Sequence, residues 1–114
     1  MGGNIDWSAQ AAREPYPGVV ARRWDGANMT VVRYEFAPGA VFPDHHHPEE
    51  QLAIVLQGTI EFHVGARTIL LGRGDEAFVP GGVPHSARAG PTGAVMLNIV
   101  APRRGGESFP YAGT

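Results

Sequence analysis

The sequence of 114 residues contains no cysteine. Disulfide bonds and thiolate metal sites are therefore excluded, and any bound metal must be held by nitrogen and oxygen atoms. The sequence also lacks a large excess of either charge, since 9 basic and 11 acidic residues leave a formal net charge of only −2. The pairs Arg22-Arg23 and Arg103-Arg104 are too short to form the concentrated basic face that nucleic acids require. We therefore expect no nucleic-acid partner.

Long apolar runs are missing as well. The longest, Leu52–Leu56, is far too short to cross a lipid bilayer, so we expect no membrane partner. The first residues, Met1–Asp6, carry neither the basic region nor the apolar stretch of a secretory signal. From these two observations we predict a cytoplasmic location.

The sequence shows no convincing amphipathic helix, because Ser8–Arg13 can form two turns at most. Instead, 16 glycines and 10 prolines separate short β-rich runs. The predicted strands are Val19–Trp24, Met29–Phe36, Val41–His47, Gln51–Leu56, Thr59–Val64, Arg67–Leu71, Glu76–Val79, Val83–Arg88 and Ala94–Val100. This spacing predicts an all-β sandwich or barrel. We expect one domain over residues 1–114, with a core of about residues 18–101 and irregular segments at Met1–Pro17 and Arg103–Thr114.

Three consecutive histidines, His45-His46-His47, are the most informative feature of the chain. Residues i and i+2 of a strand point to the same face, so His45 and His47 converge while His46 points away. Neutral imidazole is the commonest protein metal ligand near pH 7. A further histidine, His85, follows a turn rich in proline and glycine. The pattern predicts a metal site built from His45, His47 and His85.

The spacing of these residues extends to two longer motifs. The first reads G-x5-H-x-H-x3-Q-x6-G from Gly39 to Gly58, and the second reads G-x5-P-x-G-x2-H from Gly74 to His85. Both motifs, in this order, resemble those of the cupin superfamily. The resemblance implies a double-stranded β-helix, a jelly-roll-like barrel of two antiparallel sheets that holds a metal ion.

The chain departs from the cupin pattern at two positions. Gln51 stands where the first motif usually has glutamate, and Ala89 stands where the second usually has asparagine. By strand alternation Gln51 shares the face of His45 and His47, so we expect it to be the fourth ligand, with the adjacent Glu50 as the alternative. Small bacterial cupins with a His-x-His-Pro-x-Glu-Gln run are similar, which implies a ligand set of three histidines and one glutamine.

A glutamine in place of glutamate changes the electrostatics of such a site. Three neutral imidazoles and an amide leave the charge of a divalent cation uncompensated, so the site should favour anionic or chelating oxygen ligands. Four protein ligands on an octahedral ion leave two open positions, as in catalytic sites. The donor atoms suit Zn, Cu, Fe, Ni or Mn, and the sequence does not choose among them.

Three further residues are candidates for catalysis. One group of small cupins, which linearises unsaturated uronates, typically carries an Asp-x-Phe-x-Pro-x-Arg run after the last strand. Arg104 keeps the arginine position, but Asn98 replaces the aspartate, which counts against that reaction. Glu61 and Tyr34 are candidates for acid or base groups that project into the barrel. We expect His46 and Glu49 to be surface residues and His63 to be an ordinary strand histidine.

The expected function is that of a metal-dependent enzyme acting on a small, oxygen-rich, anionic substrate. A Lewis-acid mechanism in isomerase, lyase or cyclase chemistry fits the ligand set best. One alternative is a three-histidine dioxygenase that uses Fe, Cu or Ni, and another is a non-catalytic domain that binds a small metabolite. We predict a homodimer, because Gln51–Leu56 is apolar on both faces and one face needs a cover.

Overall fold

Eight antiparallel strands account for nearly all of the regular structure. In the computed structural model, which describes residues 2–105, they pair in the order β1-β2-β3-β8-β5-β6, with β4 added to β8 and β7 added to β5. The strands are β1 (Arg13–Tyr16), β2 (Val19–Asp25), β3 (Thr30–Phe36), β4 (Val41–His45), β5 (Glu50–Val64), β6 (Arg67–Leu71), β7 (Glu76–Val79) and β8 (His85–Ala101). Within this range, no helix has the length and apolar character needed to cross a membrane.

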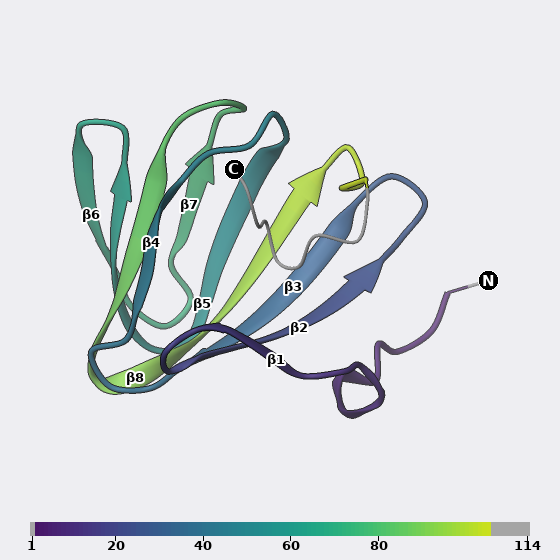
Figure 1. Cartoon of the computed structure of the whole chain (residues 1–114), viewed down its shortest axis with the longest axis horizontal. Coiled ribbons are helices and arrows are strands. Elements are labelled where there is room, and N and C mark those ends of the chain that lie inside the picture. The colour runs from purple at the N-terminus through teal and green to yellow at the C-terminus, as the bar shows by residue number, and fades with distance from the viewer. Residues whose placement is uncertain (1, 106–114) are drawn as a thin grey trace.

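The strands β5 and β8 are long enough to belong to two layers at once. The first part of β5 pairs with β7 and with the last part of β8. The rest of β5 pairs with β6 and with the first part of β8, which in turn pairs with β4. The sheet therefore folds back on itself into two facing layers, with β4 and β6 on one side and β2 and β3 on the other (Figure 1). This barrel of antiparallel strands confirms the predicted all-β fold.

The sequence predicts four shorter strands where the structure has two. Gln51–Leu56 and Thr59–Val64 merge into β5, and Val83–Arg88 and Ala94–Val100 merge into β8. The register between β5 and β8 shifts on both sides of Gly58, which marks a bulge. The bulge reverses the alternation of β5, so that Ala53 and Val55 face the core before it and Ile60 and Phe62 face the core after it. Gly58 therefore bends a continuous strand and does not end one.

Apolar side chains from alternate strand positions fill the space between the two layers. The largest fully buried ones include Tyr34, Phe62, Ile60 and Met96, and burial of each such side chain stabilises the fold by roughly 1.5–3 kcal/mol. At one end of the barrel the inward-facing row becomes partly polar, with Thr30, Val100 and Gln51 side by side on β3, β8 and β5. The histidines gather at this end.

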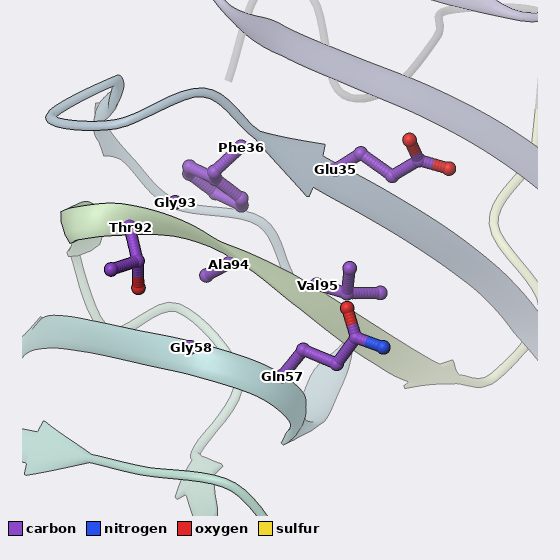
Figure 2. Close-up of a pocket in the computed structure, with 8 residues that line it drawn as sticks. All are labelled: Glu35, Phe36, Gln57, Gly58, Thr92, Gly93, Ala94 and Val95. Atoms are coloured by element: carbon purple, nitrogen blue, oxygen red, sulfur yellow. The ribbon is translucent and has the colours of Figure 1, made fainter.

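A groove of about 360 Å³ lies at the opposite end of the same strands (Figure 2). Its lining includes Glu35, Gln57 and Thr92 around Gly58 and Gly93, and it contains no histidine. The carboxylate of Glu35 is paired with Arg33 at 2.7 Å. The groove therefore lacks the ligand set that the sequence predicts for a metal site.

The N-terminal segment has more regular structure than the sequence predicts. Trp7–Ala9 forms a short 3-10 helix, η1, and the side chain of Asp6 accepts a hydrogen bond from the backbone N–H of Ser8 at 3.1 Å. The edge strand β1 then pairs with β2. These elements correct the expectation of an irregular segment over Met1–Pro17. Most of the predicted irregular segment at Arg103–Thr114 lies outside the described residues.

Candidate metal centre

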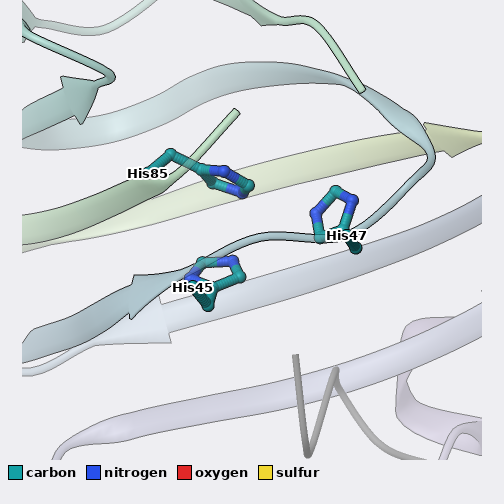
Figure 3. A group of neighbouring side chains, drawn as sticks. All are labelled: His45, His47 and His85. Atoms are coloured by element: carbon teal, nitrogen blue, oxygen red, sulfur yellow. The ribbon is translucent and has the colours of Figure 1, made fainter. Parts of the chain in front are cut away.

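The end of β4, the loop after it and the start of β8 bring His45, His47 and His85 together inside the mouth of the barrel. His45 is the last residue of β4 and lies opposite His85, the first residue of β8. All three side chains are buried, and each offers a ring nitrogen within 4.8 Å of those of the other two. Figure 3 shows the three imidazoles around a common point. The structure thus assembles the three histidines that the sequence singles out.

Each of these imidazoles is oriented by a backbone carbonyl. The Nδ1 atoms of His45, His47 and His85 lie 2.8, 3.0 and 2.9 Å from the carbonyl oxygens of Pro43, Glu49 and Val83. A carbonyl oxygen can only accept a hydrogen bond, so each Nδ1 carries the proton and donates it. The neutral ring then presents its Nε2 lone pair elsewhere. Such a contact fixes both the tautomer and the orientation of a metal-ligating histidine.

The side chain of Gln51 completes the cluster. Its Oε1 atom lies 3.1 Å from Nε2 of His47 and 3.2 Å from Nε2 of His85. With the amide in this orientation, the lone pairs of its oxygen atom face the lone pairs of the two imidazole nitrogens. A cation between these atoms would stabilise the arrangement. The amide Nε2 atom is buried without a hydrogen-bond partner among the described residues. Glu50, the alternative fourth ligand, is exposed.

Burial keeps the three histidines neutral. Removal from water disfavours the charged form of an imidazole, and it is the largest cause of the lowered pKa of His47 and of His85. For His45, the same desolvation, reinforced by the positive potential of His85, lowers the pKa to about 3. At neutral pH all three lone pairs are therefore available to a metal ion. The donor set fits a divalent transition metal and carries no charge of its own.

The predicted catalytic residues occupy three different environments. Arg104 is buried beside the histidines and pairs with Glu49. Tyr34 projects into the barrel, where its ring packs against Phe42 with centroids 5.4 Å apart, and Phe42 in turn packs against His45. The acid or base role predicted for Tyr34 and the catalytic role predicted for Arg104 both stay predictions.

Glu61 does not project into the barrel, contrary to the expectation from the sequence. It lies on the exposed outer face of β5, where its carboxylate pairs with His63 at 2.9 Å. The physical reason is the bulge at Gly58, which reverses the alternation that would otherwise place Glu61 on the face of Gln51. We therefore do not assign Glu61 to the site.

Sequence reasoning missed Glu49 as part of the site. Its side chain is only 12% exposed and pairs with Arg104 at 3.0 Å. The same alternation that places His45, His47 and Gln51 on one face also includes position 49. That signal was available, but a charged residue beside a proline favoured the surface interpretation.

Comparison with known proteins places the chain in a family. Residues 32–100, more than half of the sequence, match the model of the Cupin domain family. The chain belongs to the cupin family. The matched range contains Gln51 and the three clustered histidines, and it covers the two motifs on which the resemblance rests.

Three similar proteins illustrate the range of this cupin's relatives. A segment of 51 residues, 44% of this chain, is 41% identical to dimethylsulfoniopropionate lyase DddQ from Ruegeria pomeroyi and spans 25% of that enzyme. An RmlC-like cupin from Shewanella frigidimarina superimposes with a TM-score of 0.81 and 24% identity, covering 91% of this chain and 94% of that one. A variant of oxalate decarboxylase from Bacillus subtilis gives a TM-score of 0.77 and 25% identity, covering 89% of this chain and 31% of the decarboxylase. The small bacterial cupin predicted from the sequence is thereby confirmed.

Proposed function

We propose that this cupin is a metal-dependent enzyme that acts on a small, oxygen-rich, anionic substrate by isomerase, lyase or cyclase chemistry. The observation that carries the proposal is the convergence of three buried imidazole nitrogens and one amide oxygen at the mouth of the barrel. A divalent transition metal (Zn, Mn, Fe, Ni or Cu) held by His45, His47, Gln51 and His85 would supply Lewis acidity that polarises a substrate oxygen.

The residues of the chain favour an anion at this site. None of the four proposed ligands carries a negative charge, so they cancel none of the positive charge of a cation. Arg104 adds a guanidinium at the edge of the cluster. We assign Arg104 the role of attracting and orienting a carboxylate, because a guanidinium offers five N–H donors in a geometry that matches carboxylate oxygens. Substrate charge and site charge are then complementary.

Two of the similar proteins support this substrate class. By their names, one acts on oxalate and the other on dimethylsulfoniopropionate, and both compounds contain a carboxylate group. The similarity covers 31% of the decarboxylase and 25% of the lyase, so it supports the class of substrate and not an individual compound. The cytoplasmic location likewise stays a prediction from the sequence.

Elemental analysis of protein purified without metal-affinity resin tests the proposed function. We expect about one equivalent of a divalent transition metal per chain, because the four donor atoms converge on a single point. We also expect turnover of at least one member of a panel of small hydroxy-, keto- and dicarboxylic acids, with a rate that does not change when O₂ is removed. Protein that contains no metal and binds none when offered Zn²⁺ or Mn²⁺ would contradict the proposal. Turnover that requires O₂ would identify the dioxygenase alternative, and binding without turnover would identify the non-catalytic one.

The predicted homodimer has a candidate surface on the outer face of the layer formed by β2, β3, β8, β5 and β7. Strand registers place Trp24, Val31, Ile99, Leu52 and Phe78 in one row across five neighbouring strands. Phe78 is 56% exposed, and it borders an apolar groove of about 270 Å³ that Leu52 and Ile99 also line. We propose that a second copy of the chain covers this face.

Replacing Phe78 with glutamate should therefore convert a dimer into a monomer. In a two-fold interface the change is introduced twice, and each loss of a buried aromatic side chain costs roughly 1.5–3 kcal/mol. We expect the dissociation constant to rise about 100-fold or more, as measured by sedimentation velocity. Leu70→Glu is a matched control, because Leu70 is 74% exposed on β6, outside this row. A wild-type protein that stays monomeric at high concentration would exclude the dimer.

A further inference from the structure

Glu49 and Arg104 form a nearly buried ion pair beside the histidines. The Nη1 atom of Arg104 lies 3.0 Å from Oε1 of Glu49, and the two side chains are 9% and 12% exposed. Charged side chains are rarely buried unless they are paired, because the loss of hydration is costly. A pair retained so close to three neutral imidazoles therefore calls for an explanation.

Arg104 is held in place from several directions. Its backbone N–H donates to Oγ1 of Thr30 at 2.9 Å, and its carbonyl oxygen accepts a hydrogen bond from Arg23 at 2.9 Å. The guanidinium of Arg23 is itself paired with Asp25 at 3.0 Å. These contacts attach the segment after β8 to the rims of β2 and β3. The position of the Arg104 guanidinium near the histidines is therefore built into the fold.

Glu49 contacts both the guanidinium and an imidazole. Its backbone carbonyl accepts the hydrogen bond from Nδ1 of His47 at 3.0 Å, and its carboxylate oxygen Oε1 lies 3.5 Å from the same nitrogen. A guanidinium beside the ligands disfavours a cation there, whereas a carboxylate favours one. Arg104 therefore opposes positive charge in the cluster, and Glu49 offsets that effect.

We propose that Glu49 is a positioning residue that allows a wholly uncharged ligand set to bind a cation. Its carboxylate offsets the charge of Arg104, so that the pair as a whole adds no positive charge beside the uncharged ligands. Its backbone carbonyl also orients the ring of His47 by accepting the hydrogen bond from Nδ1. The inference rests on the proposed metal-dependent function, because it concerns the affinity of the same four ligands for a metal.

The test is the affinity of metal-free protein for Zn²⁺, measured by competition with a chromophoric chelator. In Glu49→Gln the carboxylate charge is lost while the shape of the side chain is kept. We expect the affinity to fall about 10–100-fold, the usual range for residues that contact a metal-ligating histidine. The visible spectrum of the Co²⁺ form should also change, because the variant loses the negative charge that lies 3.5 Å from Nδ1 of His47.

Two further variants separate the effect of charge from a general loss of structure. Glu35→Gln is the matched control, since Glu35 also pairs with an arginine but lies at the far end of the barrel, and its affinity should match that of the wild type. Arg104→Gln removes the opposing charge and should bind Zn²⁺ at least as tightly as the wild type. The double variant Glu49→Gln, Arg104→Gln should recover most of the affinity that the single Glu49 variant loses.

The outcomes distinguish this inference from the proposed function. Failure of the wild type itself to bind Zn²⁺ would overturn both. Binding by the wild type together with a Glu49→Gln affinity within twofold of it would overturn the role of Glu49 alone. If Glu49→Gln does not fold, as judged by circular dichroism, Arg104→Gln decides the question, because weaker binding in that variant would also overturn the inference.

Discussion

Replacing His85 with alanine is expected to abolish stoichiometric metal binding. His85 is one of three imidazoles whose nitrogens lie within 4.8 Å of one another, and it anchors the site to β8 while His45 and His47 anchor it to β4 and the following loop. Even residues that only support metal ligands contribute about 10–100-fold to affinity, so loss of a ligand should exceed that range. The measurement is metal content after purification without metal-affinity resin, together with the Zn²⁺ affinity of metal-free protein.

The histidine run supplies the control for this prediction. His46 stands between two of the proposed ligands, but it is exposed and points away from them. His46→Ala removes an imidazole from the same segment and should leave both the metal content and the Zn²⁺ affinity unchanged. Equal losses in the His46 and His85 variants would mean that the metal is held by loosely arranged surface imidazoles. An unchanged metal content in His85→Ala would contradict the centre as described.

The sequence predicted most of the site because strand alternation is local. A histidine two residues after another shares its face while the strand stays regular. His45, His47 and Gln51 are all buried, as this rule predicts, although residues 46–49 form a short loop between β4 and β5. The same rule separates Gln51 from Glu50, and the structure buries the first and exposes the second. The position of His85 opposite His45 depends on strand pairing, which only the family motif made predictable.

What the sequence could not supply depends on contacts between distant segments. Arg104 reaches Glu49 because the end of β8 is attached to Thr30 and Arg23, and no local pattern encodes that attachment. The face on which Glu61 lies could not be predicted, because a bulge adds one residue to the alternation without any change in the composition of the strand. Gly58 marks the bulge, yet a glycine between two β-rich runs is equally typical of a turn.

Replacing Gly58 with alanine is therefore expected to be among the most destabilising single changes in the chain. Gly58 has a φ of +71°, and a Cβ atom there would overlap the carbonyl oxygen of Gly93 on the adjacent strand β8. The left-handed conformation alone costs an alanine roughly 1–2 kcal/mol, and displacement of a backbone carbonyl adds to it. We expect a total loss of about 3 kcal/mol or more in the free energy of unfolding, measured by urea denaturation, a large part of the ~5–15 kcal/mol typical of a domain.

Gly39→Ala separates the two components of this cost. Gly39 has nearly the same φ, +70°, but a Cβ atom there has no neighbour within 4 Å, so only the conformational cost of roughly 1–2 kcal/mol should remain. The chain cannot escape the overlap at Gly58 by losing the bulge, because a shift of one residue would turn Ile60 and Phe62 out of the core. Equal destabilisation by the two variants would show that the backbone at Gly93 moves away from the added Cβ atom at little cost, so that the overlap contributes little to the loss of stability.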